Sequence, residues 1–298
     1  MFIEQLFNGL VLGSIYSLIA LGYTLVYGIL MMINFAHSEV LMVGAFVGLA
    51  AYTLLAPPAG GWVALVLVLL VAMTASGLLG IVIEKLAYRP LRQAARLAPL
   101  ISAIGVSIIL SNAVFLWVSN QLLSFPKVVP EQSISLGFMK IGSLQILIFF
   151  TSLILMAVLH FMVQKTKMGK AMRACADDLT TSGLMGIDVN KVIAFTFLIG
   201  GALAGAAGVL NGMYYGSIKY NLGFLPGVKA FTAAVLGGIG NIAGAVLGGF
   251  LLGILEVMAA GYLPNGSQWK DVFAFVVLIG VLLIRPSGIL GERIAEKI

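Results

Sequence analysis

Hydrophobic residues in this chain form long uninterrupted runs, bounded by short polar stretches. Such runs cover Leu6–Met32, Trp62–Ile83, Leu144–Val163 and Val192–Leu210. Each approaches or exceeds the roughly 20 residues that a helix needs to cross a bilayer. Backbone polar groups in lipid must be satisfied within the protein, so a spanning chain forms either a helix bundle or a closed barrel. Barrel strands would alternate apolar and polar residues, whereas these runs are apolar on all sides. We therefore predict an all-α bundle of transmembrane helices.

Further runs and the breaks between them set the number of membrane segments. Additional apolar runs cover Val40–Leu55, Pro99–Trp117, Ile242–Tyr262 and Val272–Ile284. A shorter run, Leu222–Leu236, is followed by a polar and glycine-rich break that contains Gly237, Gly238, Gly240 and Asn241. This run either crosses with strain or enters as a half-helix and turns back, which is tolerated where protein buries the backbone. We expect about eight membrane segments, one or two of them short or re-entrant, in a single domain over residues 1–298.

The distribution of charge predicts the orientation of the bundle. Only 9% of the 298 residues are charged, and the net charge is +6, whereas soluble domains carry roughly a quarter charged residues. By the positive-inside rule, three basic clusters are expected in the cytoplasm. They are Lys85, Arg89, Arg92 and Arg96; Lys165, Lys167, Lys170, Arg173 and Lys191; and Arg285, Arg293 and Lys297. The remaining basic residues, expected on the opposite side, are Lys127, Lys140, Lys219, Lys229 and Lys270. These clusters indicate topology and not nucleic-acid binding; the N-terminus is then outside.

One long basic loop, Gln164–Lys191, is expected on the cytoplasmic side. Small residues after its basic start predict a short helix, and a structured inside loop favours docking of a partner protein. The single cysteine, Cys175, lies in this loop, so neither an intrachain disulfide nor a thiol metal site is expected. The N-terminus lacks the basic region and cleavage site of a signal peptide, so the first run is expected to be retained.

The polar stretch between the first two runs contains candidate functional residues, namely Asn34, His37, Ser38 and Glu39. The predicted topology places this stretch toward the inside. Asn34 or Ser38 could cap the helix that starts near Glu39, whose charge would favour the positive helix end. Alternatively, these residues line the transport path or its gate. Asn221 precedes a second short apolar helix in a similar way, and paired broken helices are typical of transporters.

Ionisable residues within membrane spans are functional candidates by default. Glu256 is the carboxylate most deeply embedded in an apolar run, whereas Glu84, beside Lys85, is expected at the interface. Motifs for phosphate binding, nucleophilic catalysis or zinc-dependent hydrolysis do not occur in the sequence, so we predict a protein that is not an enzyme and has no cofactor. A single carboxylate, Glu256, is not enough to indicate proton coupling. The energy for transport is therefore expected from a partner or from a passive gradient.

Glycine pairs at four-residue spacing, such as Gly9/Gly13, Gly201/Gly205 and Gly244/Gly248, lie on one face of a helix. They predict close packing of helices, either within the bundle or across a subunit interface.

Four blocks of the sequence together resemble a known family. They are Tyr27–Phe46 (YGILMMINFAHSEVLMVGAF), Met168–Ile187 (MGKAMRACADDLTTSGLMGI), Lys229–Gly249 (KAFTAAVLGGIGNIAGAVLGG) and Arg285–Gly291 (RPSGILG). The chain resembles, over nearly its whole length, the LivH-type permease subunits of high-affinity branched-chain amino acid ABC importers. The resemblance implies an inner-membrane protein of bacteria that carries leucine, isoleucine or valine. It also implies a second homologous permease, two cytoplasmic ATPases and a periplasmic binding protein as partners.

In that family the inside loop supplies a coupling helix to the ATPase. The resemblance assigns this role to the segment Met168–Ile187, although the loop lacks a Glu-Ala-Ala start. The matching positions are Arg173, Ala174, Asp178, Gly183 and Gly186. Other interpretations remain open at this point: an ABC permease for another amino acid, an amide or a sugar; a stand-alone secondary transporter or channel; or a membrane scaffold.

Overall fold

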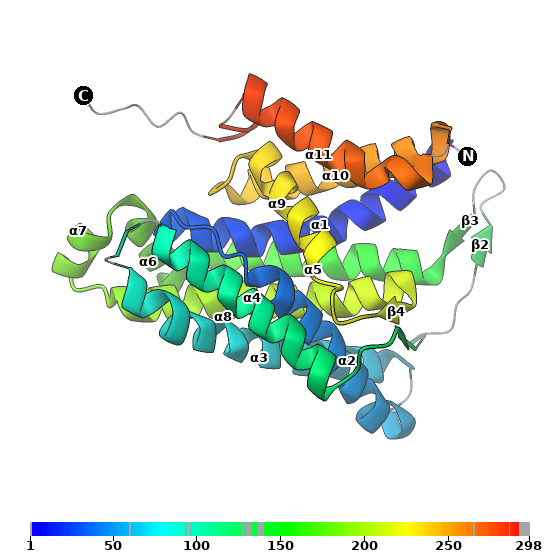
Figure 1. Ribbon diagram of the computed structural model, residues 1–298, viewed down its shortest axis with the longest axis horizontal. Coiled ribbons are helices and arrows are strands. Elements are labelled where there is room, and N and C mark those ends of the chain that lie inside the picture. Colours follow the sequence, from blue (N-terminus) through cyan, green and yellow to red (C-terminus); the bar gives the residue numbers. More distant parts are fainter. Residues whose placement is uncertain are drawn as a thin grey trace.

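The protein is an elongated bundle of helices that lie roughly along one long axis, as Figure 1 shows for the computed structural model. The structure describes residues 2–59, 61–92, 94–95, 97–126, 128, 133–135, 140–264, 266–285 and 287–291. Four residues used to predict the orientation, Arg96, Lys127, Arg293 and Lys297, lie outside this described part, as does Pro286.

Long helices account for most of the described chain. They are α1 (Phe2–Leu30), α2 (His37–Ala59), α3 (Gly61–Ile83), α4 (Leu97–Trp117), α5 (Ser143–Lys165), α8 (Val189–Tyr215), α9 (Phe224–Gly237), α10 (Ile242–Tyr262) and α11 (Gly266–Ile284). Two short helices, α6 (Lys167–Asp177) and α7 (Leu179–Leu184), lie between α5 and α8. Among the described residues, seven helices are long and apolar enough to cross a membrane, and α9 is a shorter apolar helix of 14 residues. The prediction of an all-α membrane bundle with a short segment is confirmed.

Two small antiparallel ribbons lie at the end of the bundle that carries the N-terminus (Figure 1). Strand β1 (Leu123–Ser124) pairs with β4 (Ser217–Ile218), and β2 (Ser133–Ser135) pairs with β3 (Lys140–Gly142). Helices α6 and α7 lie at the opposite end. That end also carries basic residues from the clusters expected inside, which makes it the cytoplasmic end.

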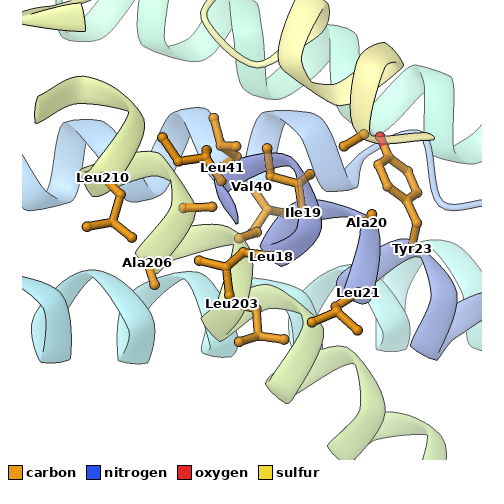
Figure 2. Close-up of a cluster of buried hydrophobic side chains, with 14 of the residues drawn as sticks. Leu18, Ile19, Ala20, Leu21, Tyr23, Val40, Leu41, Leu203, Ala206 and Leu210 are labelled. Atoms are coloured by element: carbon orange, nitrogen blue, oxygen red, sulfur yellow. The ribbon is translucent and has the colours of Figure 1, made fainter. Parts of the chain in front are cut away.

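Helix α1 forms the centre of the bundle and packs against α8, α9 and α10. Figure 2 shows Leu18 and Ile19 of α1 in one apolar cluster with Leu41 of α2 and with Leu203 and Leu210 of α8. Leu18 and Ile19 are completely buried. Such packing explains why α1 has no polar face: protein surrounds it on nearly all sides.

Glycines allow the long helices to approach closely within the chain. A Cβ atom on Gly13 would lie 2.8 Å from the Cα of Phe250 in α10, and one on Gly205 would lie 2.6 Å from the carbonyl oxygen of Ala72 in α3. Both distances are far shorter than ordinary carbon contacts. These predicted glycine pairs therefore serve packing between helices of this chain.

Helix α2 begins deep inside the bundle. After α1 ends at Leu30, the chain turns at Met31, whose φ is 54°, and folds back. His37 then lies against Gly22, two turns before the end of α1, which corresponds to about 12 Å along the helix. The stretch predicted toward the inside thus folds back along α1, and α2 starts about two turns before the end of α1.

Helix α9 also begins inside the bundle, after the loop that follows α8. It packs on α1 and α10 and ends near the cytoplasmic end, where Gly240 lies beside Gly28 of α1. Helix α10 then returns to the opposite end (Figure 1). The sequence left two arrangements open for this run, a strained crossing or a half-helix that turns back. In the structure it crosses, as a loop followed by a half-length helix.

The glycine break reverses the chain between α9 and α10. Gly238 and Gly240 have φ values of +108° and +96°, a left-handed region that favours glycine. Asn241 then caps α10, because its Oδ1 accepts a hydrogen bond of 3.0 Å from the N–H of Gly244.

The C-terminal segment Ser287–Gly291, which we call the clasp, closes over this break. The N–H groups of Ile289 and Leu290 donate to the carbonyls of Leu236 and Gly237 at 2.9 Å each. The last carbonyls of a helix have no partner within the helix. The clasp therefore supplies hydrogen-bond donors to the last carbonyl groups of α9, which lipid has no donors to satisfy.

We predict that Gly238→Leu destabilises the fold. The new side chain would require a strained φ, which costs about 1–3 kcal/mol, and its Cβ would lie 2.7 Å from the Cα of Gly291 in the clasp. Thermal unfolding of the detergent-purified protein measures the effect. Gly280→Leu is the matched control, because nothing lies within 4 Å of a Cβ at that position. Equal stability of the two variants would contradict this account of the break.

Candidate functional site

The starts of α2 and α9 meet inside the bundle, and we call this contact the helix junction. A Cβ atom on Gly223, just before α9, would lie 2.7 Å from the carbonyl carbon of Ser38 in α2. The rings of Phe35 and Phe231 lie 6.1 Å apart across the same contact. The two broken helices noticed in the sequence are therefore neighbours in space. The start of the full-length helix α2 thus contacts the start of the shorter helix α9 within the bundle.

Asn34 holds the turn that leads into α2. Its Oδ1 accepts hydrogen bonds from the N–H of Ala36 at 3.1 Å and from the hydroxyl of Tyr88 at 3.2 Å. The N–H of His37 donates to the carbonyl of Asn34 at 3.1 Å. Ser38 instead donates its hydroxyl to the carbonyl of Phe35 at 3.1 Å. Asn34 thus stabilises the turn, and Ser38 does not cap the helix.

Glu39 reaches a neighbouring helix. The residue is only 2% exposed. Its carboxylate accepts hydrogen bonds from the hydroxyls of Ser107 and Ser111 of α4 at 3.4 and 3.3 Å. These distances are long for bonds between oxygen atoms. Glu39 also lies in the first turn of α2, where a negative charge favours the positive helix end. It therefore combines the helix-end role with a weak connection to α4.

Aromatic rings surround His37 at the junction. The imidazole is buried and lies edge-on to Tyr23 of α1, with ring centroids 4.9 Å apart. Tyr23 in turn lies 6.1 Å from Phe231 of α9, and Figure 2 shows its side chain at the edge of the apolar cluster. The sequence did not identify these aromatic residues, because Tyr23 and Phe231 lie within ordinary apolar runs of separate segments and Phe35 is an apolar residue in the polar stretch.

The cytoplasmic loop folds as two helices instead of the single predicted helix. Thr166 caps α6, and its Oγ1 accepts from the N–H of Gly169 at 3.0 Å. Asp178 begins α7, because its Oδ1 accepts from the N–H of Thr181 at 2.7 Å. This bond holds the pKa of the Asp178 carboxyl below its usual range. Asp178 thus breaks the helix at a corner, since its side chain competes for the backbone.

The other residues expected in this loop are not all on one surface. Arg173 donates to the carbonyl of Val163 and so fastens α6 to the end of α5. Gly183 lies within α7, whereas Gly186, with a φ of +86°, follows its end. Ala174 lines a shallow pocket of about 230 Å³. The other lining residues are Asp177, Asp178, Thr181, Ser182, Met185 and Ile187.

The tip of this loop presents apolar side chains to the cytoplasm. Leu184 and Met185 are 83% and 79% exposed. They lie at the basic end of the bundle, beyond the membrane helices (Figure 1). Exposed apolar side chains beside a pocket are features of a protein-binding surface.

Glu256 belongs to a buried network of charges. Lys229 of α9 places its Nζ 2.7 Å from Glu256 Oε1 in α10 and 2.6 Å from Asp271 Oδ1 in α11. Tyr16 of α1 donates its hydroxyl to Glu256 Oε2 at 2.9 Å. The prediction that Lys229 lies outside was wrong: the residue is 4% exposed and joins α9 to two other helices. Its position within an apolar run was the signal for burial.

Comparison with known proteins gives a full-length match. The chain matches the family described as "Branched-chain amino acid transport system / permease component" over residues 5–282. It is 50% identical to the high-affinity branched-chain amino acid transport system permease protein BraD of Pseudomonas aeruginosa, over 100% of this chain and 98% of that protein. It is 45% identical to the corresponding protein LivH of Escherichia coli K12, with the same coverage. The autoinducer 2 import system permease protein LsrC of Yersinia pestis is 32% identical over 44% of this chain and 39% of its own length.

We predict that Lys229→Met destabilises the protein strongly. It would leave Glu256 buried without its ammonium partner, and breaking such a pair costs about 3–5 kcal/mol. The double variant Lys229→Met/Glu256→Gln should recover much of this loss in thermal unfolding. Lys191→Met is the control, because it removes an exposed ion pair with Asp188 and should change stability little. Similar unfolding of all three variants would show that the buried pair is not stabilising.

Proposed function

This chain belongs to the family of branched-chain amino acid transport permease components, and on that premise we propose that it forms part of the path for leucine, isoleucine and valine in an ATP-driven importer. The chain is a multi-pass inner-membrane protein and a transport subunit, not an enzyme. Its identity to named branched-chain amino acid permeases over their full length supports the assignment of substrate.

The helix junction carries the proposal for the path. Helices α2 and α9 both begin there, and the aromatic side chains of Tyr23, Phe35 and Phe231 lie at their contact. Separation of α2 from α9 would open the bundle between apolar and aromatic side chains. Such a lining suits a substrate with an aliphatic side chain, whose zwitterion has no net charge.

The cytoplasmic loop carries the proposal for the partner ATPases. Leu184 and Met185 would dock on an ATPase subunit, with the Ala174 pocket beside them. We propose two such ATPases, a second homologous permease and a periplasmic binding protein that delivers the amino acid. The ribbons β1/β4 and β2/β3 lie at the end where that protein would arrive (Figure 1).

A second candidate function is import of another small solute by the same machinery. The partial match to an autoinducer 2 permease favours it, because related chains then serve different cargoes. Competition separates the two candidates: excess isoleucine or valine should suppress leucine uptake if the path serves branched-chain amino acids.

Uptake of labelled leucine into proteoliposomes tests the proposal. The vesicles contain this chain, its partner permease and the ATPases, with binding protein on one side and ATP on the other. We expect uptake to require ATP and the binding protein. Concentrative uptake by this chain alone under an ion gradient would overturn the proposal in favour of a secondary transporter.

We predict that Ala174→Trp prevents ATPase binding without harming insertion. The site lies outside the membrane, and the indole would fill the pocket that Ala174 lines. Affinity recovery of the ATPases from solubilised membranes should fall at least tenfold, and uptake should fall with it. Ala176→Trp on the same helix is the control, because Ala176 is exposed and does not line the pocket. Full recovery of the ATPases with Ala174→Trp would contradict the docking role and show that the loop is only a linker.

We predict that Glu39→Gln lowers leucine uptake at least severalfold at normal expression. The direct cost to stability should be small, about 0.3–1 kcal/mol from the lost charge at the helix end. The larger effect would come from the connection to α4, so the double variant Ser107→Ala/Ser111→Ala should reproduce it. Near-normal uptake by Glu39→Gln would restrict this residue to a role at the helix end.

A further inference from the structure

The segment that joins α3 to α4 has an unusual backbone and unusual partners. After Ile83, α3 continues as a π-helix over Glu84–Tyr88 and then as a 3-10 turn over Arg89–Leu91. Single π-helical turns within helices are rare and occur frequently at functional sites. We call the residues from Glu84 to Arg92 the connecting segment.

At its cytoplasmic side, the connecting segment is bonded to the end of the cytoplasmic loop Gln164–Lys191, which we call the docking loop. Glu84 is fully buried by protein, and its carboxylate pairs with Arg89 at 3.2 Å and with Arg92. Arg92 Nη1 also donates to Oδ1 of Asn190 at 2.8 Å. Asn190 lies in the first turn of α8, which Asp188 caps where the docking loop ends. Arg92 therefore links the connecting segment to the end of the loop.

At its other side, the connecting segment reaches the helix junction. Tyr88 is fully buried, and its ring packs 5.1 Å from that of Phe197 in α8. Its hydroxyl lies 3.2 Å from both Asn34 Oδ1 and the carbonyl oxygen of Ile33. The same Asn34 oxygen accepts from the N–H of Ala36. Tyr88 thus contacts the group that shapes the turn before α2.

These contacts form one continuous chain from the docking loop to the helix junction. Each step is a hydrogen bond or an ion pair: Asn190 to Arg92, Arg92 to Glu84, and Tyr88 to Asn34. Glu84 and Tyr88 belong to the same helical turn, so covalent structure joins the two halves. Coupling between distant sites travels through such contiguous networks, but it requires direct tests of coupling.

We infer that the connecting segment transmits movement of the docking loop to the start of α2, with Tyr88 as the positioning residue that acts through Asn34. This inference rests on the proposed function, because it supposes that ATPases bind the loop. It adds a specific route by which their movement opens the helix junction.

Tyr88→Phe in the reconstituted importer tests the inference. The variant keeps the buried ring and removes only the hydroxyl. We expect normal assembly and ATP hydrolysis within twofold of wild type, with leucine uptake per ATP hydrolysed reduced at least fivefold. Tyr262→Phe is the matched control, since Tyr262 is exposed at the far end of α10. Asn190→Ala, which alters an exposed residue at the other end of the route, should give the same loss.

Coupling between Tyr88 and Asn34 is measured separately. If both act through their hydrogen bond, the double variant Tyr88→Phe/Asn34→Ala should lose no more uptake per ATP than Asn34→Ala alone. Additive losses would overturn the inference, as would unchanged uptake per ATP in Tyr88→Phe. A parallel fall in assembly, hydrolysis and uptake would also overturn it, because it would show a structural role only.

Hydrogen exchange gives a readout that does not depend on transport. Exchange at the amides of Ala36 and His37 should rise at least tenfold in Tyr88→Phe, because the turn loses one of its anchors, and should stay at the wild-type rate in Tyr262→Phe. Unchanged exchange in Tyr88→Phe would overturn the route. Failure of the wild-type complex to import leucine would instead overturn the proposed function, so the two failures are distinguishable.

Discussion

The need to satisfy backbone polar groups away from water governs this structure. A helix that starts or ends inside a bilayer leaves N–H or C=O groups without partners, and lipid supplies none. The chain solves this at α2 with the Asn34 side chain and at the end of α9 with the clasp. The Asn34 bond is local, whereas the clasp is a distant segment that only the folded bundle brings to α9.

Buried charged side chains also need partners within the protein, and their main effect is to hold helices in position. A buried ion pair recovers its desolvation cost only when its geometry and its other hydrogen bonds are good. Lys229 meets this condition with Glu256 and Asp271, and the hydroxyl of Tyr16 donates a further hydrogen bond to Glu256. Glu84 meets it with two arginines at the cytoplasmic end. The first group joins α9 to α10 and α11, and the second joins α3 to α8. Between them, the starts of α2 and α9 have mainly aromatic and small-residue contacts.

The candidate site was partly predictable from residue types. Asn34 and Glu39 were recognisable because polar residues between apolar runs are rare, and Gly238 because glycine permits a left-handed backbone. Tyr88 and Lys229 were not recognised. Tyr88 lies within a basic, interface-like stretch between Lys85 and Arg89, and a lysine counts equally toward loop charge or a buried pair until its partners are known. Local sequence shows that a group needs a partner without showing where the partner lies.

The sequence by itself determined the fold class and the family, and it predicted the cytoplasmic end from the charges of the loops. These properties depend on composition and short-range order, since hydrophobic length and loop charge act on each helix separately. Only the tertiary structure decided that the starts of α2 and α9 meet, that the clasp covers the end of α9, and that Tyr88 reaches Asn34. Each of these contacts joins residues far apart in the chain. Their geometry depends on how the helices pack, and close packing is a property of surfaces in three dimensions.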